Sequence, residues 1–311
     1  MASEQNRAQP GAMAADVPAM GPIAFIGLGN MGGRMARRLV EAGYEVHGYD
    51  LSAQARADFE RCGGAAAAST AQAVAGTDIT ILMLPDSNVV EEVVTGPAVL
   101  DALATGATVV DMSSSEPGRT RALERVLAQR GVSLVDAPVS GGVQRAESGE
   151  LAIMTGGRQA DVSRLEPVFS VLGRAYQAGP IGAGHAVKAL NNLMSATHLL
   201  VTSEAILAGQ RFGLDTDVML AIFNTSSGRS GSTENKWPNF IASERFNSGF
   251  GLRLMVKDMR IATRLAEQVG SPSALGAYAA ELWSRAADGL PLDADHTEIA
   301  RWLGQHTEGD T

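Results

Sequence analysis

The segment from Pro22 to Asp50 constrains the fold more than any other part of this chain. An apolar run, 23–26, enters a glycine-rich turn, and a helical pattern then leads to a second apolar run that ends at Asp50. The turn consists of Gly27, Leu28, Gly29, Asn30, Met31 and Gly32. Its glycines permit a sharp strand-to-helix turn, a close phosphate approach and tight helix–strand packing. The segment predicts a unit that binds a dinucleotide at a helix N-terminus.

Asp50 stands where a carboxylate would accept hydrogen bonds from the ribose of a bound adenosine. It lies 23 residues after Gly27, at the end of the second apolar run. A carboxylate at this place repels a 2′-phosphate, so the sequence favours NAD over NADP as the cofactor. Arg56, one helical turn further on, would weaken that preference.

Composition narrows the possible partners. The 311-residue chain has a formal net charge of −9 and no basic tract, which argues against nucleic acid and anionic membranes. No segment reaches the roughly 18 uninterrupted apolar residues that a membrane span needs. The five histidines are scattered, and the single cysteine, Cys62, lies in no ligand-like spacing. We therefore expect no protein-bound metal and a reducing, cytoplasmic setting.

The first part of the chain predicts a doubly wound domain. Residues 1–21 have neither a basic start nor an apolar centre, so we expect a disordered leader there and not a signal peptide. Residues 22–181 alternate apolar runs with helical patterns, which predicts a mostly parallel Rossmann-type sheet covered on both faces. The expected strands are 23–27, 44–49, 78–84, 107–111, 132–136, 151–155 and 173–177, and the expected helices are 30–42, 52–62, 69–75, 87–94, 118–130 and 159–171.

The second part predicts helices only. Residues 182–210 form an expected connecting helix with apolar side chains on every side, as in a helix buried between domains or in an oligomer contact. Residues 211–305 form an expected all-helical C-terminal domain, with helices at 214–224, 233–243, 250–269, 272–287 and 295–303. The surplus of apolar residues predicts a homodimer or homotetramer.

The carboxyl ends of the predicted strands are the places where ligands collect in open α/β sheets. After the strand at 132–136, Ser140, Gly141 and Gly142 offer a hydroxyl and closely spaced backbone N–H groups, which suit a substrate carboxylate. Taken alone, this tripeptide is more typical of an ordinary turn.

Lys188 makes a functional interpretation of this region stronger. It stands in an otherwise apolar helix, where an ammonium is costly unless it lines a polar cleft. Asn192 follows four residues later on the same helical face and could orient the amine. A desolvated lysine has a lowered pKa and can transfer protons near neutral pH. The alternative is a lysine that extends along the helix to solvent.

Four segments occur in the order that one known family shows. They are GLGNMGGRMARRLVEAG (27–43), DAPVSGGVQRAESGEL (136–151), GAGHAVKALNN (182–192) and KDMRIA (257–262). With them the chain resembles the β-hydroxyacid dehydrogenase family, the group of 3-hydroxyisobutyrate dehydrogenases and tartronate semialdehyde reductases. The resemblance spans about 22–305 and implies that Lys188 is the catalytic proton carrier, with Asn192 and residues 140–142 in the substrate site.

The resemblance also implies roles that the residues alone do not. It places these residues against the cofactor: Leu84, Pro85, Ser114, Phe250 and Lys257. Members often have Thr where this chain has Ser114, a change that keeps the hydroxyl. From the residues alone, without the family resemblance, we would interpret Phe250 as a core residue. Lys257-Asp258 would be an exposed ion pair of negligible energy. Lys236 ends a polar, glycine-rich stretch similar to one in some members and is a candidate substrate contact; a solvated surface lysine is equally consistent.

The expected activity is hydride transfer between NAD and the β-hydroxyl carbon of a small, 3-hydroxyisobutyrate-like acid, with Lys188 as general acid and base. One alternative on the same fold is an NADPH-dependent imine reductase, although such enzymes typically have Asp or Tyr in place of the lysine. Another is a semialdehyde or glyoxylate reductase, which more often has Asn-Arg where this chain has Asp50-Leu51. A remote alternative is a non-catalytic cofactor-binding scaffold.

Overall fold

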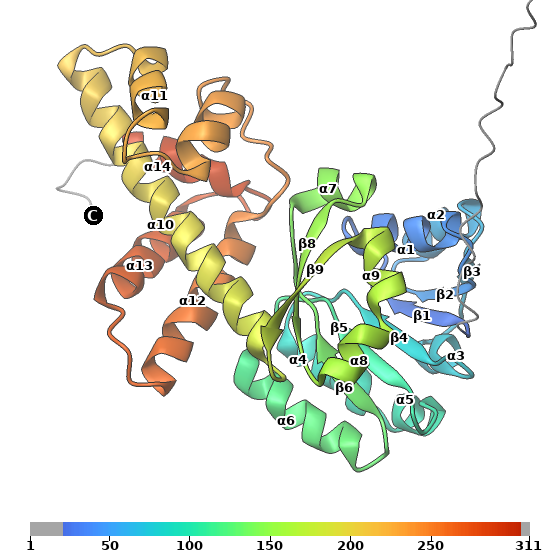
Figure 1. Cartoon of the computed structure of the whole chain (residues 1–311). Coiled ribbons are helices and arrows are strands. Elements are labelled where there is room, and N and C mark those ends of the chain that lie inside the picture. The colour runs from blue at the N-terminus through green and yellow to red at the C-terminus, as the bar shows by residue number, and fades with distance from the viewer. Residues whose placement is uncertain (1–20, 306–311) are drawn as a thin grey trace, which may run out of the picture.

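The structure, a computed structural model, describes residues 21–305 of the chain. A sheet domain comes first, a long helix leaves it, and a group of helices surrounds the far part of that long helix (Figure 1). The predicted leader at 1–21 lies, except for Gly21, outside the described residues.

The sheet has nine strands among the described residues. They are β1 (Ile23–Ile26), β2 (Val46–Tyr49), β3 (Ala65–Ala66), β4 (Ile79–Leu82), β5 (Thr108–Asp111), β6 (Ser133–Asp136), β7 (Val139–Ser140), β8 (Leu151–Gly156) and β9 (Gly173–Gly179). Their order is β3-β2-β1-β4-β5-β6-β8-β7, and β9 pairs with β8. The strands from β1 to β6 run parallel, whereas β8 is antiparallel to β6 and β7. Six parallel strands therefore end at one edge of the sheet.

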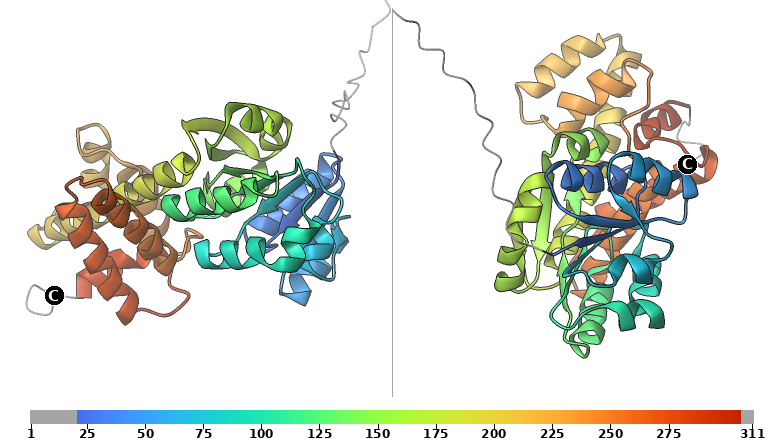
Figure 2. Two further views of the ribbon diagram at one scale, coloured as in Figure 1. Left: turned by 90° about the horizontal axis from the view of Figure 1, so that it is seen from below. Right: turned by 90° about the vertical axis from the view of Figure 1, so that its right-hand side faces the viewer.

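Helices cover both faces of this sheet, as Figure 2 shows from two sides. They are α1 (Gly32–Glu41), α2 (Ala53–Arg61), α3 (Thr70–Val74), α4 (Ser87–Thr95), α5 (Pro97–Ala102), α6 (Pro117–Ala128), α7 (Gly142–Ser148), α8 (Gln159–Arg164) and α9 (Glu166–Leu172). In β1, Ile23 and Phe25 pack in the core beneath α1 and α9, and Ala24 and Ile26 pack in the opposite core with α3 and α6. Burial on both faces explains why the strand is a continuous apolar run.

The predicted fold class is confirmed, and the differences are local. The sequence patterns missed β3, β7, α5 and α7, because elements of two to seven residues are too short for a period to show. The single helix expected at 159–171 is the pair α8 and α9, which meet at Leu165. Pro167, in the first turn of α9, lacks the N–H that a continuous helix would need.

Helices make up the rest of the described chain. They are α10 (Ala183–Phe212), α11 (Thr216–Asn224), η1 (Ser232–Ile241), α12 (Leu252–Gln268), α13 (Ala274–Gly289), η2 (His296–Glu298) and α14 (Ile299–Gln305). Trp237, Trp283 and Trp302, all buried, anchor a core that is separate from those of the sheet domain. The helix expected at 233–243 is a π-helix, η1, with Pro238 inside it.

Helix α10 spans both parts of the molecule, and in the single chain it is not buried all round. Val187, Leu190, Met194 and Val201 expose 42%, 43%, 59% and 54% of their surface. The spacing of three, four and seven residues puts them on one side of the helix. Within residues 21–305, no helix has both the length and the apolar content to cross a membrane.

Candidate active site

A cavity of about 280 Å³ lies at the carboxyl ends of the parallel strands, where α10 and α12 meet the sheet domain. The chain segments that follow β4, β5 and β6 form one wall, and Lys188, Lys257 and Asp258 form the other. These predicted site residues line it together: Asn30, Met31, Leu84, Pro85, Ser114, Ser140, Gly141, Gly142, Lys188, Phe250 and Lys257. Residues from six separate segments of the sequence thus share one cavity.

The glycine-rich turn leads from β1 into α1 beside this cavity. Gly27 has φ +96°, and a Cβ on Gly32 would lie 1.9 Å from the Gly27 carbonyl oxygen, so neither position accepts a side chain. A Cβ on Gly29 would meet nothing within 4 Å. The N-cap of α1, Met31, makes no side-chain hydrogen bond, and the first turn holds no acidic residue. An open surface in front of free helical N–H groups fits the phosphates of a dinucleotide.

A second cavity of about 370 Å³ adjoins the turn on the side of α2, with Leu28, Gly29 and Asn30 in its lining. Asp50 directly follows β2 at this place, and its Oδ2 accepts a hydrogen bond from the Leu28 N–H at 2.7 Å. Arg56 donates to the Asp50 carbonyl oxygen at 2.5 Å and lies 5.7 Å from the Tyr49 ring centre. Asp50 therefore braces the turn and also presents a carboxylate next to the cavity.

Asp136 fixes the start of α10 and so the position of Lys188. Its Oδ1 accepts from the Gly182 N–H at 2.7 Å, and its Oδ2 accepts from the His185 N–H at 2.8 Å. A Cβ on Gly184 would lie 2.1 Å from a backbone carbonyl oxygen of β8, so α10 docks tightly on the sheet. Lys188 follows one turn later, which directs its side chain into the cavity.

Lys188 is buried, with 7% of its surface exposed. Within residues 21–305 its amine has no hydrogen-bond partner. Burial lowers the pKa of the Lys188 ammonium, Asp258 opposes that shift, and Lys257 adds to it. The alternative of a lysine that reaches bulk solvent is therefore wrong. A buried amine with a lowered pKa can exchange a proton near neutral pH.

Asp258 is the polar residue of the cavity that the sequence did not single out. It is 1% exposed, and its Oδ2 accepts a hydrogen bond from the Asn192 side chain at 2.6 Å. Its Oδ1 has no hydrogen-bond partner, although the Lys257 Nζ lies 3.4 Å away. The interpretation of Lys257-Asp258 as an exposed ion pair is wrong. The signal available in the sequence was the Asp itself, at an apolar-face position of an amphipathic helix.

Lys257 connects the helical part to the sheet domain. Its Nζ donates to the carbonyl oxygens of Pro85 and Ser114, at 2.9 Å each. These carbonyls belong to the segments that follow β4 and β5, so Lys257 holds two walls of the cavity together.

Two of the predicted substrate contacts do not line this cavity. Asn192 lies behind it and reaches it only through its hydrogen bond to Asp258. Lys236 lies on η1, 5.6 Å from the Phe240 ring centre, and is not in the lining. Lys236 is half-buried, and this burial lowers the pKa of its ammonium while Asp295 opposes that shift.

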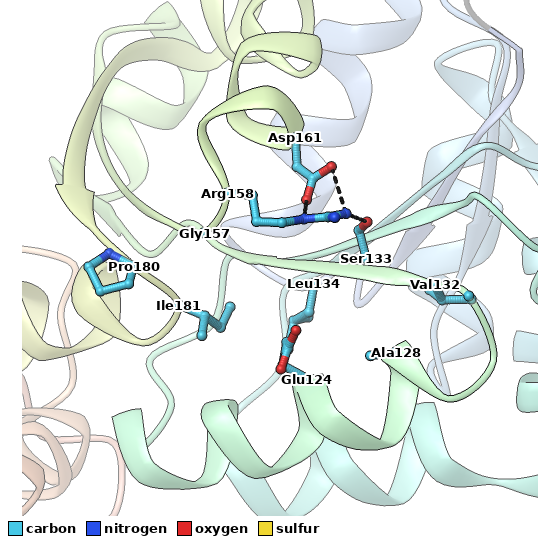
Figure 3. A pocket seen from close by; sticks show the side chains of 11 residues that line it. Glu124, Ala128, Val132, Ser133, Leu134, Gly157, Arg158, Asp161, Pro180 and Ile181 are labelled. Carbon is cyan, nitrogen blue, oxygen red and sulfur yellow. Dashed lines mark hydrogen bonds and ion pairs between the residues drawn. The ribbon is translucent and has the colours of Figure 1, made fainter.

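A cavity of about 460 Å³ at the opposite, amino-terminal end of β6 offers a contrast (Figure 3). Arg158 extends across it and bonds Asp161 at 2.8 Å and the Ser133 hydroxyl at 2.7 Å. These polar groups satisfy one another, and no lysine lines the cavity. Residues 21–305 also contain no group of three side chains that could hold a metal ion.

The fold and the cavity define the class of protein as a dinucleotide-binding dehydrogenase. The family model described as "NAD binding domain of 6-phosphogluconate dehydrogenase" matches residues 22–182. The model described as "NAD-binding of NADP-dependent 3-hydroxyisobutyrate dehydrogenase" matches residues 182–303. The chain belongs to the β-hydroxyacid dehydrogenase family.

Relatives of known identity agree with this assignment. The 2-(hydroxymethyl)glutarate dehydrogenase of Eubacterium barkeri is 38% identical over 84% of this chain and 87% of its own length. The 3-hydroxyisobutyrate dehydrogenase of Pseudomonas aeruginosa is 36% identical over 89% of this chain and 95% of its own. The structure of Mycobacterium tuberculosis 3-hydroxyisobutyrate dehydrogenase with L-serine has a TM-score of 0.86 and 31% identity, and covers 91% of this chain and 99% of its own.

Proposed function

We propose that this protein transfers a hydride between NAD and the β-hydroxyl carbon of a small hydroxy acid, with Lys188 as general acid and base. The observation that carries the proposal is the buried Lys188 amine in a cavity at the carboxyl ends of the parallel strands. Family membership supports the reaction class, since the relatives of known identity are dehydrogenases of hydroxy acids.

In the proposed reaction, the neutral Lys188 amine accepts the hydroxyl proton during oxidation and returns it during reduction. A bound nicotinamide supplies the hydride acceptor. Burial lowers the pKa of the Lys188 ammonium, which favours the neutral amine that the proposed proton acceptor requires. Asp258 opposes that shift and so favours the ammonium, which is the proposed acid in reduction.

The substrate carboxylate docks, in this proposal, on the turn formed by Ser140, Gly141 and Gly142. Gly141 and Gly142 have φ +135° and +69°, and a Cβ on Gly142 would meet nothing within 4 Å. The backbone of this turn is therefore open to a ligand in the cavity that Lys188 also lines. A cavity of about 280 Å³ that also receives the reactive end of the cofactor leaves room for a small acid only.

NAD is the proposed cofactor, on the basis of Asp50. Its carboxylate lies at the end of β2 and hydrogen-bonds the Leu28 and Ser52 N–H groups, which fixes a negative charge beside the second cavity. Such a charge disfavours a 2′-phosphate. Arg56 forms no ion pair with the Asp50 carboxylate, since its guanidinium donates to the carbonyl oxygens of Asp50 and Leu51.

Steady-state kinetics tests the proposal. We expect the highest kcat/KM with NAD and one of the β-hydroxy acids 3-hydroxyisobutyrate, serine, glycerate or 3-hydroxypropionate, because all place a carboxylate and a β-hydroxyl at the same separation. NADP, glyoxylate, succinic semialdehyde and simple imines complete the panel. Turnover of imines alone with NADPH, or NADH binding without turnover of any acid, would replace the proposal by an imine reductase or a scaffold.

We further propose that the exposed apolar side of α10 pairs with a second copy of the chain. Val187, Leu190, Met194 and Val201 form this surface. Light scattering of a dilution series is expected to show a dimer or tetramer, and Met194→Glu with Val201→Glu to shift it towards monomer. Gln210→Glu, on the same helix, serves as the control. A wild-type protein that stays monomeric at all concentrations contradicts the proposal.

A further inference from the structure

A buried acidic residue outside the cavity holds one of its walls. Asp295 precedes η2 and is 9% exposed. Its Oδ2 accepts from the Gly249 N–H at 2.9 Å and from the Phe250 N–H at 3.3 Å. Gly249 and Phe250 line the cavity, whereas Asp295 does not. One carboxylate oxygen thus fixes the backbone from which the Phe250 ring extends.

The other oxygen of Asp295 fixes the carboxylate itself. Its Oδ1 accepts from the Thr297 N–H at 2.9 Å and from the Thr297 hydroxyl at 2.6 Å, which caps η2. The Ser248 hydroxyl lies 2.9 Å from Oδ1 and 3.0 Å from Oδ2. The carboxylate therefore joins the start of η2 to residues 248–250 beside the cavity. The hydrogen bonds on either side can be removed separately by substitution.

The neighbouring groups strengthen this link. The His296 N–H donates to the Phe250 carbonyl oxygen at 2.8 Å, and its ring stands edge-on to the Phe250 ring at 5.7 Å. Burial and the nearby Lys236 lower the pKa of His296 to about 4, against the opposing effect of Asp295. Burial alone would raise the pKa of the Asp295 carboxyl, but the Thr297 and Ser248 hydrogen bonds and His296 outweigh it and lower that pKa. Near neutral pH, Asp295 is thus an anion beside a neutral imidazole.

We propose that Asp295 is a positioning residue for the cofactor site: it holds residues 248–250 so that Phe250 forms the wall of the cavity opposite Leu84 and Pro85. The inference rests on the proposed NAD site and concerns its preorganisation. An asparagine has one acceptor oxygen in place of two, so it cannot satisfy the donors on both sides. The amide N–H₂ would also face donors, which displaces the loop.

The test compares two variants that each alter the hydrogen bonds of the Asp295 carboxylate. Asp295→Asn is expected to raise the Kd for NADH, measured by fluorescence titration, and the KM for NAD by about tenfold. Thr297→Val removes only a donor on the η2 side, so it is the matched control: it should lower Tm and leave both constants within about twofold. If the role of Asp295 is only structural, the two variants should bind NADH with the same affinity when they are compared at equal Tm.

A double-mutant cycle identifies the residue through which Asp295 acts. If it acts through Phe250, Asp295→Asn adds less than about twofold to the NADH Kd in a Phe250→Ala background. Additive effects, or an unchanged Kd in the single variant, overturn the inference. Should Asp295→Asn fail to fold, Ser248→Ala loosens the loop side and is expected to raise the Kd by about threefold. Absence of NADH binding by the wild-type enzyme would overturn the cofactor site itself, which is a different result.

Discussion

Replacement of Lys188 by alanine is expected to lower kcat by roughly 10²–10⁴-fold and to leave NADH binding nearly unchanged. The amine is the proposed proton acceptor for the substrate hydroxyl, so its loss affects the chemical step. We expect cofactor affinity to depend mainly on the glycine-rich turn and on α1, whereas Lys188 belongs to α10. Near-normal turnover in this variant would exclude the proposed mechanism.

The pH profile gives the same prediction a second readout. Oxidation needs neutral Lys188, so kcat/KM for the hydroxy acid should rise with pH as the ammonium loses its proton. Because burial lowers the pKa of Lys188, this rise should be centred well below its ordinary value of 10.5. In Lys188→Ala the rise should disappear.

Chemical rescue separates lost chemistry from lost structure. Ethylamine added to Lys188→Ala should restore part of kcat, because the vacated space accepts a small primary amine of similar basicity. Glu204→Gln changes the charge of an exposed residue on the same helix and should keep wild-type kinetics. A kcat close to that of the wild type without added amine, together with a normal NADH Kd, would show that Lys188 has no role in proton transfer.

Replacement of Asp258 by asparagine should lower kcat by about tenfold to a hundredfold and shift the pH profile. The carboxylate raises the pKa of Lys188, so its loss should lower that pKa further and move the rising limb to lower pH. The variant also turns the 2.6 Å hydrogen bond from Asn192 into a weaker contact between neutral groups.

A matched control for Asp258 lies on the same helix. Glu267→Gln removes one negative charge from an exposed position of α12, so it should leave both kcat and the profile unchanged. A rising limb that stays in place in Asp258→Asn would show that Asp258 does not act on Lys188. The measurement needs only initial rates of NADH formation over a range of pH.

The fold class follows from local patterns in the sequence. Strands such as β1 are continuous apolar runs because helices cover both of their faces, and α12 has a pronounced apolar side. The turn from Gly27 to Gly32 was also recognisable, because a sharp strand-to-helix turn requires glycines at fixed positions within six residues. The sequence patterns missed elements too short for their period to show, such as α5 and α7.

The candidate site was recognisable only in part, and the exceptions share a cause. Asp258 bonds Asn192 across 66 positions of sequence, and Asp295 bonds Gly249 across 46. These partners are too far apart in the sequence for a local pattern to connect them, so Asp258 was interpreted as half of an exposed pair with Lys257. Lys236 lies on η1, 5.6 Å from the Phe240 ring centre, and its contact with substrate stays a prediction.

The amino-acid order by itself thus determined the sheet domain, the helical remainder, the glycine turn and the position of a lysine in an apolar helix. Only the tertiary structure decided which side chains surround that lysine. The physical reason is range: periodicity and turn chemistry act over a few residues, whereas the pairing of α10 with α12, or of η2 with the 248–250 loop, depends on how whole elements pack.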